Sequence, residues 1–111
     1  MSQPVPELSV VVPLYDEEES LPQLVDQLLA AMRVLDLSFE LVLVDDGSKD
    51  GTANVLSALA ATVPELVAVL LRRNYGQSAA MAAGFDASSG AVIVTLDGDL
   101  QNDPVDIPLL L

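Results

Sequence analysis

Two aspartates separated by a single glycine follow a continuous apolar run near the end of the chain. Residues 91–96 read Ala-Val-Ile-Val-Thr-Leu and lead directly into Asp97-Gly98-Asp99. The β-branched residues of this run predict a buried strand, so both carboxylates are expected at its carboxyl end, where open α/β sheets bind ligands. Two oxygen donors there suit Mg²⁺ or Mn²⁺ with substrate phosphates. Taken alone, the tripeptide more often marks a solvated turn.

The composition limits the remaining chemistry. The 111 residues include no Cys and no His, which excludes disulfides, thiolate nucleophiles, Cys zinc sites and histidine bases. With 17 acidic and 4 basic side chains, the formal net charge is −13. Nucleic acid is therefore excluded as a partner, because its binding depends on Lys and Arg. An anionic substrate would need a metal cation, helix N-termini or the few Lys and Arg.

The elements that must position these residues alternate between strand and helix. The expected strands are continuous apolar runs at residues 8–12, 39–44, 66–71 and 91–96. The expected helices cover residues 20–32, a segment from about 50 or 52 to 63, and residues 77–87. Ser20 is the expected N-cap of the first helix. This pattern favours an α/β fold with a parallel sheet and helices on both faces.

Polar clusters follow each of the four expected strands. They are Tyr15-Asp16-Glu17, Asp45-Asp46-Gly47-Ser48, Arg73-Asn74 and Asp97-Gly98-Asp99. In a parallel sheet all four lie at the same edge, so together they predict a ligand-binding crevice.

The same clusters carry a family resemblance that covers nearly the whole chain. Its motifs, in order, are Val12-Pro13-Leu14-Tyr15-Asp16-Glu17-Glu18, Leu43-Val44-Asp45-Asp46-Gly47-Ser48, Arg73-Asn74-Tyr75-Gly76-Gln77 and Leu96-Asp97-Gly98-Asp99-Leu100-Gln101-Asn102-Asp103-Pro104. The sequence resembles the family 2 glycosyltransferases of GT-A fold, in the branch that glycosylates polyisoprenyl phosphates, such as dolichol-phosphate mannosyltransferase. Asp16 departs from the Asn usual in that family. The resemblance implies a three-layer, Rossmann-like nucleotide-binding half, and we predict the sheet order 3-2-1-4.

The resemblance also implies roles for single residues. Pro13, Tyr15 and Glu17 would line the nucleobase and ribose pocket. Asp45 would accept a hydrogen bond from a base N–H, and Arg73 would contact the nucleotide. Asp46 has two open interpretations, a nucleotide contact and a turn or helix-cap element.

The metal ligands are likewise implied by the resemblance. Asp97 would contact ribose or metal, and Asp99 with Gln101 would hold the metal on the diphosphate. Asp99 is the residue expected to be essential for catalysis.

The implied reaction is an inverting transfer of a hexose from a nucleoside-diphosphate sugar (GDP-mannose or a UDP-hexose) to a polyisoprenyl phosphate, with Mg²⁺ or Mn²⁺. Residues 1–111 would then be the N-terminal, nucleotide-sugar-binding part of a longer protein, with the acceptor half following the apolar residues 109–111. The expected location is the cytoplasm or the cytoplasmic face of a membrane. No signal peptide is visible, and no apolar run approaches the ~20 residues that cross a bilayer.

Two alternatives remain open at this point. The chain could be a non-catalytic nucleotide- and metal-binding fragment, or part of a family 2 transferase with a hydroxyl acceptor. A nucleotidyltransferase is disfavoured, because the loop after the first strand is acidic and lacks the Gly-rich basic sequence of such enzymes. A receiver domain is disfavoured because an acidic pair recurs after the fourth strand.

Overall fold

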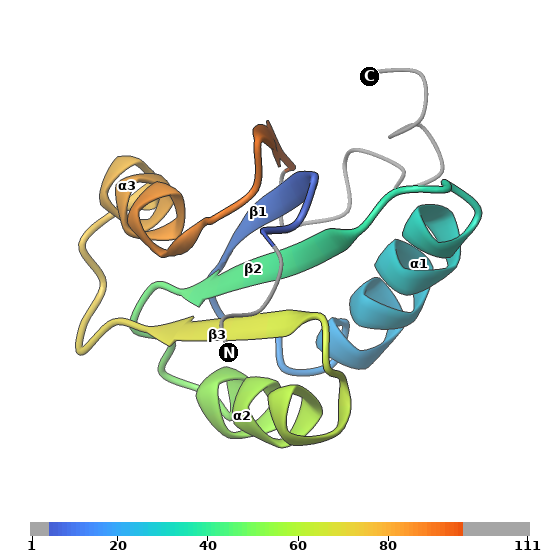
Figure 1. The fold of residues 1–111 in the computed structure, drawn as a ribbon. Helices are drawn as coiled ribbons and strands as arrows, with labels where there is room; N and C mark the ends of the chain where they lie inside the picture. Colours follow the sequence, from blue (N-terminus) through green and yellow to red (C-terminus); the bar gives the residue numbers. More distant parts are fainter. Residues whose placement is uncertain (1–4, 97–111) are drawn as a thin grey trace.

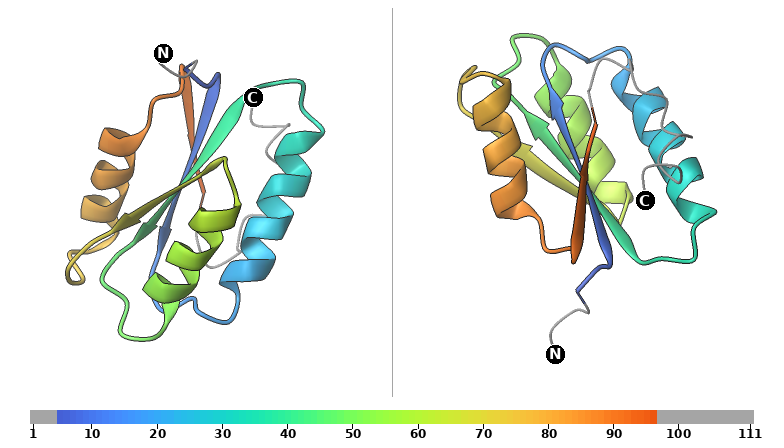
Figure 2. Two further views of the ribbon diagram at one scale, coloured as in Figure 1. Left: turned by 60° about the horizontal axis from the view of Figure 1, so that its bottom comes forward. Right: turned by 90° about the horizontal axis from the view of Figure 1, so that it is seen from above.

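The computed structural model describes residues 5–96, which form three layers with the sheet in the middle (Figures 1 and 2). The elements are β1 (Leu8–Leu14), α1 (Leu21–Arg33), β2 (Phe39–Asp45), α2 (Thr52–Thr62), β3 (Leu66–Leu70), α3 (Gln77–Ala87) and β4 (Val92–Thr95). Helices α1 and α2 cover one face of the sheet and α3 covers the other. Within the described residues, no helix combines the length and apolar character needed to cross a membrane.

The four strands form one parallel sheet in the order β3-β2-β1-β4. Leu8 of β1 pairs with Phe39 of β2 and with Val92 of β4, and Leu41 of β2 pairs with Leu66 of β3. The predicted order and the parallel arrangement are confirmed. Strands β1, β2 and β3 therefore deliver their following loops to the same edge of the sheet.

The core has two sides because successive strand residues point to opposite faces. The side under α1 and α2 buries the strand residues Leu8, Val10, Val12, Leu14, Leu41 and Leu43. The side under α3 is smaller and centres on Val11, Val42, Val44 and Ala80. Burial on both faces explains why β1 and β2 read as unbroken apolar runs.

Helix α1 begins where the sequence predicts, but the predicted N-cap hydrogen bond to its first turn is not formed. Ser20 occupies the N-cap position and makes no side-chain cap hydrogen bond. Its hydroxyl instead donates to the Glu17 carboxylate at 2.7 Å. Pro22 is tolerated in the first turn because its missing N–H would have no helical partner there.

Strand β1 runs two residues further than predicted and includes the buried Pro13. The Leu14 carbonyl accepts from the Asp46 N–H, and the Val11 carbonyl accepts from the Leu96 N–H. Bonding therefore alternates between the two neighbours, and the Pro13 nitrogen faces the β4 side. β4 pairs with β1 only as far as Thr95 opposite Val11. Among the pairs of β1 with β4 that residues 5–96 form, the proline thus replaces no ladder donor.

The expectation of a buried fourth strand is wrong. Val92 is 52% exposed and Ile93 is 41% exposed. β4 has β1 on one side and is the edge strand of the sheet that the described residues form. Apolar composition predicts the strand, but burial depends on what covers it, and no described element covers this edge.

Helix α3 approaches the sheet closely at Gly84. A Cβ at Gly84 would lie 2.4 Å from a γ-carbon of Val11 and 3.2 Å from one of Val44. We expect Gly84→Leu to destabilise the protein by about 3 kcal/mol, because overpacking forces buried β-branched side chains to move. Denaturant unfolding measures this loss. Ala82→Leu is the control on the exposed side of the helix, with an expected change within about 0.5 kcal/mol; equal losses would contradict the packing.

Candidate functional site

The loops after β1, β2 and β3 meet at the carboxyl edge of the sheet. Hydrogen bonds tie the β1–α1 loop to the β2–α2 loop, and others tie the end of β2 to the β3–α3 loop. Three of the polar clusters that the sequence places at one edge are therefore brought together. The fourth cluster, at Asp97 and Asp99, lies outside the described residues.

Asp16 joins the first two loops. Its backbone is left-handed, with φ of 53°. Its Oδ1 accepts from the Lys49 N–H at 2.8 Å and the Asp50 N–H at 3.4 Å, and its own N–H donates to the Ser48 hydroxyl at 2.8 Å. Asp and Asn are the non-glycine residues that best tolerate this conformation. The side chain acts through one oxygen, which Asn also carries.

This geometry predicts opposite results for two substitutions at Asp16. Asp16→Asn should change the free energy of unfolding by less than about 0.5 kcal/mol, since it keeps both the acceptor and the tolerance for positive φ. Asp16→Ala should cost about 1–2 kcal/mol through strain, in addition to the lost acceptor. Thermal or denaturant unfolding of both variants checks the prediction, and equal losses would show that the charge matters more than the acceptor.

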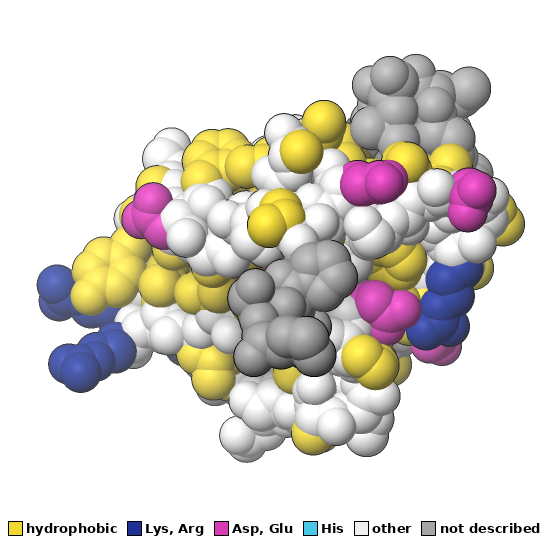
Figure 3. Space-filling model, in the orientation of Figure 1, with side chains coloured by type: hydrophobic (Ala, Val, Ile, Leu, Met, Phe, Trp, Pro, Cys, Tyr) yellow, Lys and Arg dark blue, Asp and Glu magenta, His cyan; other side chains and the backbone are white. Residues whose placement is uncertain are grey.

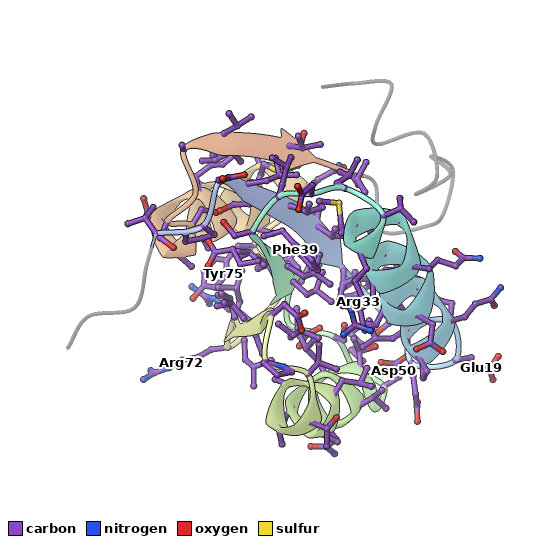
Figure 4. The ribbon with its side chains drawn as sticks, turned by 45° about the vertical axis from the view of Figure 1, so that its right-hand side comes forward. Glu19, Arg33, Phe39, Asp50, Arg72 and Tyr75 are labelled. Carbon is purple, nitrogen blue, oxygen red and sulfur yellow. The ribbon has the colours of Figure 1, made fainter. Side chains whose placement is uncertain are left out.

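The acidic residues after Asp16 line a shallow depression beside the start of α1. Its lining residues are Asp16, Glu17, Glu18, Glu19, Ser20 and Asp50. Figure 4 labels Glu19 and Asp50 on this side of the molecule. The Thr52 hydroxyl, which donates to the Asp50 carboxylate, lowers the pKa of Asp50 despite some desolvation. The Asp50 carboxylate in this depression therefore carries its negative charge at neutral pH.

Asp45 ends β2 with its side chain buried at 2% exposure. Its Oδ1 accepts from the Ser48 hydroxyl and from the Ser48 N–H. Its Oδ2 receives no hydrogen bond from residues 5–96. Asp45 thus combines a fixed orientation with one acceptor that a ligand donor could use.

Asp46 is also buried, at 4% exposure, but both of its carboxylate oxygens are occupied. Oδ1 accepts from the Tyr75 N–H at 2.9 Å. Oδ2 accepts from the Gly76 N–H at 3.0 Å and from the Asn74 amide at 3.2 Å. The Asn74 amide also reaches the Asp46 carbonyl at 3.3 Å. The carboxylate therefore binds the loop that precedes α3.

Gly47 allows these two loops to touch. Its φ is +67°, and a Cβ there would lie 2.0 Å from the carbonyl carbon of Arg73 and 2.3 Å from the nitrogen of Asn74. Both contacts are with backbone, which cannot swing aside as a side chain can. The close approach therefore requires glycine.

The loop that Asp46 binds presents a cation. The Arg73 guanidinium lies 5.0 Å from the centroid of the Tyr75 ring, a cation–π contact. Arg73 and its neighbour Arg72 are exposed, and Arg72 extends away from the body of the molecule (Figure 4). Figure 3 shows Lys and Arg side chains beside apolar ones at the end to which β2 and β3 point. Arg73 and Tyr75 thus place a planar cation beside an exposed aromatic ring.

The other predicted site residues are placed as follows. Tyr15 is 38% exposed at the edge, directly after β1. Pro13 is buried within β1. Glu17 donates its N–H to the Thr52 hydroxyl at 2.9 Å and is partly buried. The sequence reasoning missed the stacking of Tyr75 on Arg73, although both belong to the quoted Arg73–Gln77 motif.

The predicted metal ligands Asp97, Asp99 and Gln101 lie outside the described residues. Within residues 5–96, no three acidic side chains come together as a site for a metal ion. Leu96, the last described residue, is 5% exposed and donates its N–H to Val11, so the chain leaves β4 at the same edge as the other loops. The predicted metal ligands that follow in the sequence, Asp97, Asp99 and Gln101, all offer oxygen atoms, which suit a hard divalent cation.

Comparisons with known proteins agree with this arrangement. Residues 9–111 match the family described as glycosyl transferase family 2. An undecaprenyl-phosphate 4-deoxy-4-formamido-L-arabinose transferase of Yersinia pestis (strain Pestoides F) is 48% identical over 113 residues, covering 100% of this chain and 34% of that protein. A Yersinia pseudotuberculosis protein of the same name gives the same values. The chain thus spans about a third of the length of these curated relatives.

Solved structures show the same fold. The mannosyltransferase PcManGT from Pyrobaculum calidifontis, in complex with GDP-Man and Mn²⁺, is similar with a TM-score of 0.71 and 27% identity over 85% of this chain and 28% of that one. The S. aureus protein TarS (1-349), in complex with UDP-GlcNAc, gives a TM-score of 0.66 and 26% identity over 84% of this chain and 26% of that one. With its fold, its polar strand ends and the match over residues 9–111, the chain belongs to glycosyl transferase family 2.

Proposed function

We propose that the protein transfers a sugar from a nucleoside diphosphate to a polyisoprenyl phosphate, and that residues 1–111 are its nucleotide-binding part. The observation that carries this proposal is the joining of three polar strand ends at one edge of a parallel sheet. The 48% identity to undecaprenyl-phosphate 4-deoxy-4-formamido-L-arabinose transferases supports the acceptor class.

In this proposal the nucleotide contacts residues at the ends of three strands, β1, β2 and β3. Asp45 offers its Oδ2 to a base N–H, since its Oδ1 is engaged by Ser48. Arg73, stacked on Tyr75, meets the base edge or a phosphate. Tyr15 supplies apolar surface beside Pro13, which is buried within β1, and Glu17 faces the ribose. In the similar solved structures, the ligands named are GDP-Man and UDP-GlcNAc.

A divalent cation, Mg²⁺ or Mn²⁺, completes the proposed site. Asp97, Asp99 and Gln101 would hold it, and when bound it stabilises negative charge on the departing diphosphate. The similar mannosyltransferase PcManGT was solved with Mn²⁺. The need for a cation also follows from charge, because the chain carries −13 and its β1–α1 loop is acidic.

The acceptor chemistry suits a chain without histidine. A phosphate acceptor is already ionised at neutral pH, so no side-chain base has to remove a proton before attack. The acceptor oxygen displaces the nucleoside diphosphate directly and inverts the anomeric carbon. This reaction would take place in the cytoplasm or at the cytoplasmic face of a membrane, where the lipid phosphate is embedded.

The donor sugar has two candidates. The family resemblance implies a hexose, carried by GDP or UDP. The relatives at 48% identity are named for a pentose derivative, 4-deoxy-4-formamido-L-arabinose. Since the described residues belong to the nucleotide side of the site, they favour neither sugar, and the pentose derivative is the first donor to test.

The test is a transfer assay with the full-length protein and undecaprenyl phosphate. Nucleotide-linked 4-deoxy-4-formamido-L-arabinose, GDP-mannose and UDP-glucose are supplied in parallel, with Mg²⁺, with Mn²⁺ and with chelator. Sugar recovered in the lipid extract with one donor, and only with metal, is the expected result. Transfer to a hydroxyl acceptor instead would favour the alternative acceptor class. Nucleotide binding without transfer to either acceptor would favour a non-catalytic binding protein.

A further inference from the structure

We infer that Asp46 is a positioning residue that fixes Arg73 for nucleotide binding and does not itself contact the nucleotide. The inference rests on the proposed function and assigns a role that the family motif leaves open. Asp46 is buried, at 4% exposure, but so is Asp45 at 2%, so the hydrogen bonds and not the burial distinguish the two residues.

The main observation is that both of its carboxylate oxygens already accept hydrogen bonds from one loop. Tyr75 N–H, Gly76 N–H and the Asn74 amide donate to the two carboxylate oxygens at 2.9, 3.0 and 3.2 Å. A base or ribose donor would have to share an oxygen that already accepts a bond from the loop. The neighbouring Asp45 differs, because its Oδ2 receives no donor from residues 5–96. The two aspartates therefore divide two tasks, contact by Asp45 and support by Asp46.

A second observation is where the support leads. The three donors are consecutive residues, and Arg73 comes directly before them. The backbone of Arg73 is also pressed against Gly47, within 2.0 Å of a Cβ built there. Gly47 and Asp46 thus hold the backbone of residues 73–76. This fixes the points from which the Arg73 and Tyr75 side chains extend, and the guanidinium lies 5.0 Å from the centroid of the ring.

A double-mutant cycle on the full-length protein tests this role, with UDP and GDP as probes in the presence of Mg²⁺. We expect Asp46→Asn to weaken nucleotide binding about tenfold, because the amide replaces one acceptor by a donor that faces a backbone N–H. Arg73→Ala should weaken it by a similar or larger factor. In the Arg73→Ala background, Asp46→Asn should change the affinity by less than about twofold, because coupled residues are not additive.

Steady-state kinetics give a second readout. A positioning role predicts that Asp46→Asn raises the donor KM with kcat nearly unchanged, since uniform binding is lost. Glu40→Gln is the matched control for stability alone. Glu40 is a partly buried carboxylate of β2 that accepts from the Ser89 N–H at 2.7 Å and the Ser9 hydroxyl at 2.6 Å, at the opposite end of the strand. It should lower the melting temperature and leave nucleotide affinity unchanged.

The outcomes separate the two proposals. If the wild-type protein binds neither UDP nor GDP, the proposed function fails. If it binds one of them and the effects of Asp46→Asn and Arg73→Ala add in full, Asp46 acts independently and the inference is overturned. Should Asp46→Asn fail to fold, Asn74→Ala removes a single donor to the carboxylate. It should weaken binding by a smaller factor that also vanishes in the Arg73→Ala background; a loss that persists there overturns the inference.

Discussion

Asp99→Asn is expected to lower sugar transfer by the full-length protein by a factor of about 10²–10³, equivalent to about 2.7–4 kcal/mol. The reason is that the substitution removes one negative charge from the proposed metal site and leaves the departing diphosphate without its stabilising cation. The fold should survive, since β4 ends at Thr95, before this residue. A transfer assay at saturating donor and metal, together with a melting curve, measures both expectations.

The matched control for Asp99→Asn is Asp86→Asn. Asp86 is exposed on α3, so its substitution changes the net charge by the same amount away from the carboxyl edge. It should transfer sugar at the wild-type rate. If Asp99→Asn also turned over near the wild-type rate with metal present, the assignment of Asp99 to the metal site would be wrong.

Gly47→Ala is expected to have the largest effect on stability, a loss of about 3–5 kcal/mol from strain and overpacking combined. A methyl group at this position would need the left-handed conformation, with φ of +67°, and would overlap the backbone of Arg73 and Asn74. Typical domains have only about 5–15 kcal/mol of stability, so much of the protein should be unfolded at moderate denaturant. Denaturant titration followed by circular dichroism measures the shift.

Gly76→Ala separates the two causes of that loss. Gly76 also has positive φ, at +104°, but nothing lies within 4 Å of a Cβ built there. Its substitution should therefore carry only the conformational strain, about 1–3 kcal/mol. A loss for Gly47→Ala no larger than about 1–2 kcal/mol, the cost of left-handed strain alone, would show that the contact between the two loops contributes nothing.

Much of the fold could be predicted because its signals are local. Continuous apolar runs placed all four strands, and helix α3 was predicted with the bounds that the structure shows, Gln77–Ala87. The exposure of β4 could not be predicted, because valine and isoleucine, as at Val92 and Ile93, occur both in buried strands and in exposed edge strands. The position of Ser20 at the N-cap was predicted correctly. Its hydroxyl, however, donates to the Glu17 carboxylate, an acceptor that N-cap preferences do not take into account.

The site was predictable in its location and less so in its contacts. The order of polar strand ends predicted one shared edge, and the structure confirms this for the loops after β1, β2 and β3. The bonds of Asp46 reach residues 28 to 30 positions away, and no local pattern reports such partners. The same holds for Glu40, whose partner Ser89 is 49 positions away. The metal ligands after Leu96 remain a prediction.

The central position of β1 has a consequence for how the chain folds. β1 is made first, and it pairs on one side with β2 and on the other with β4. The bond between the Gly90 N–H and the Ser9 hydroxyl joins residues 81 positions apart. During synthesis, β1, β2 and β3 can assemble while the β4 side of β1 still has no partner strand. Non-local parallel pairing of this kind slows folding, so we expect docking of β4 to be the late kinetic step.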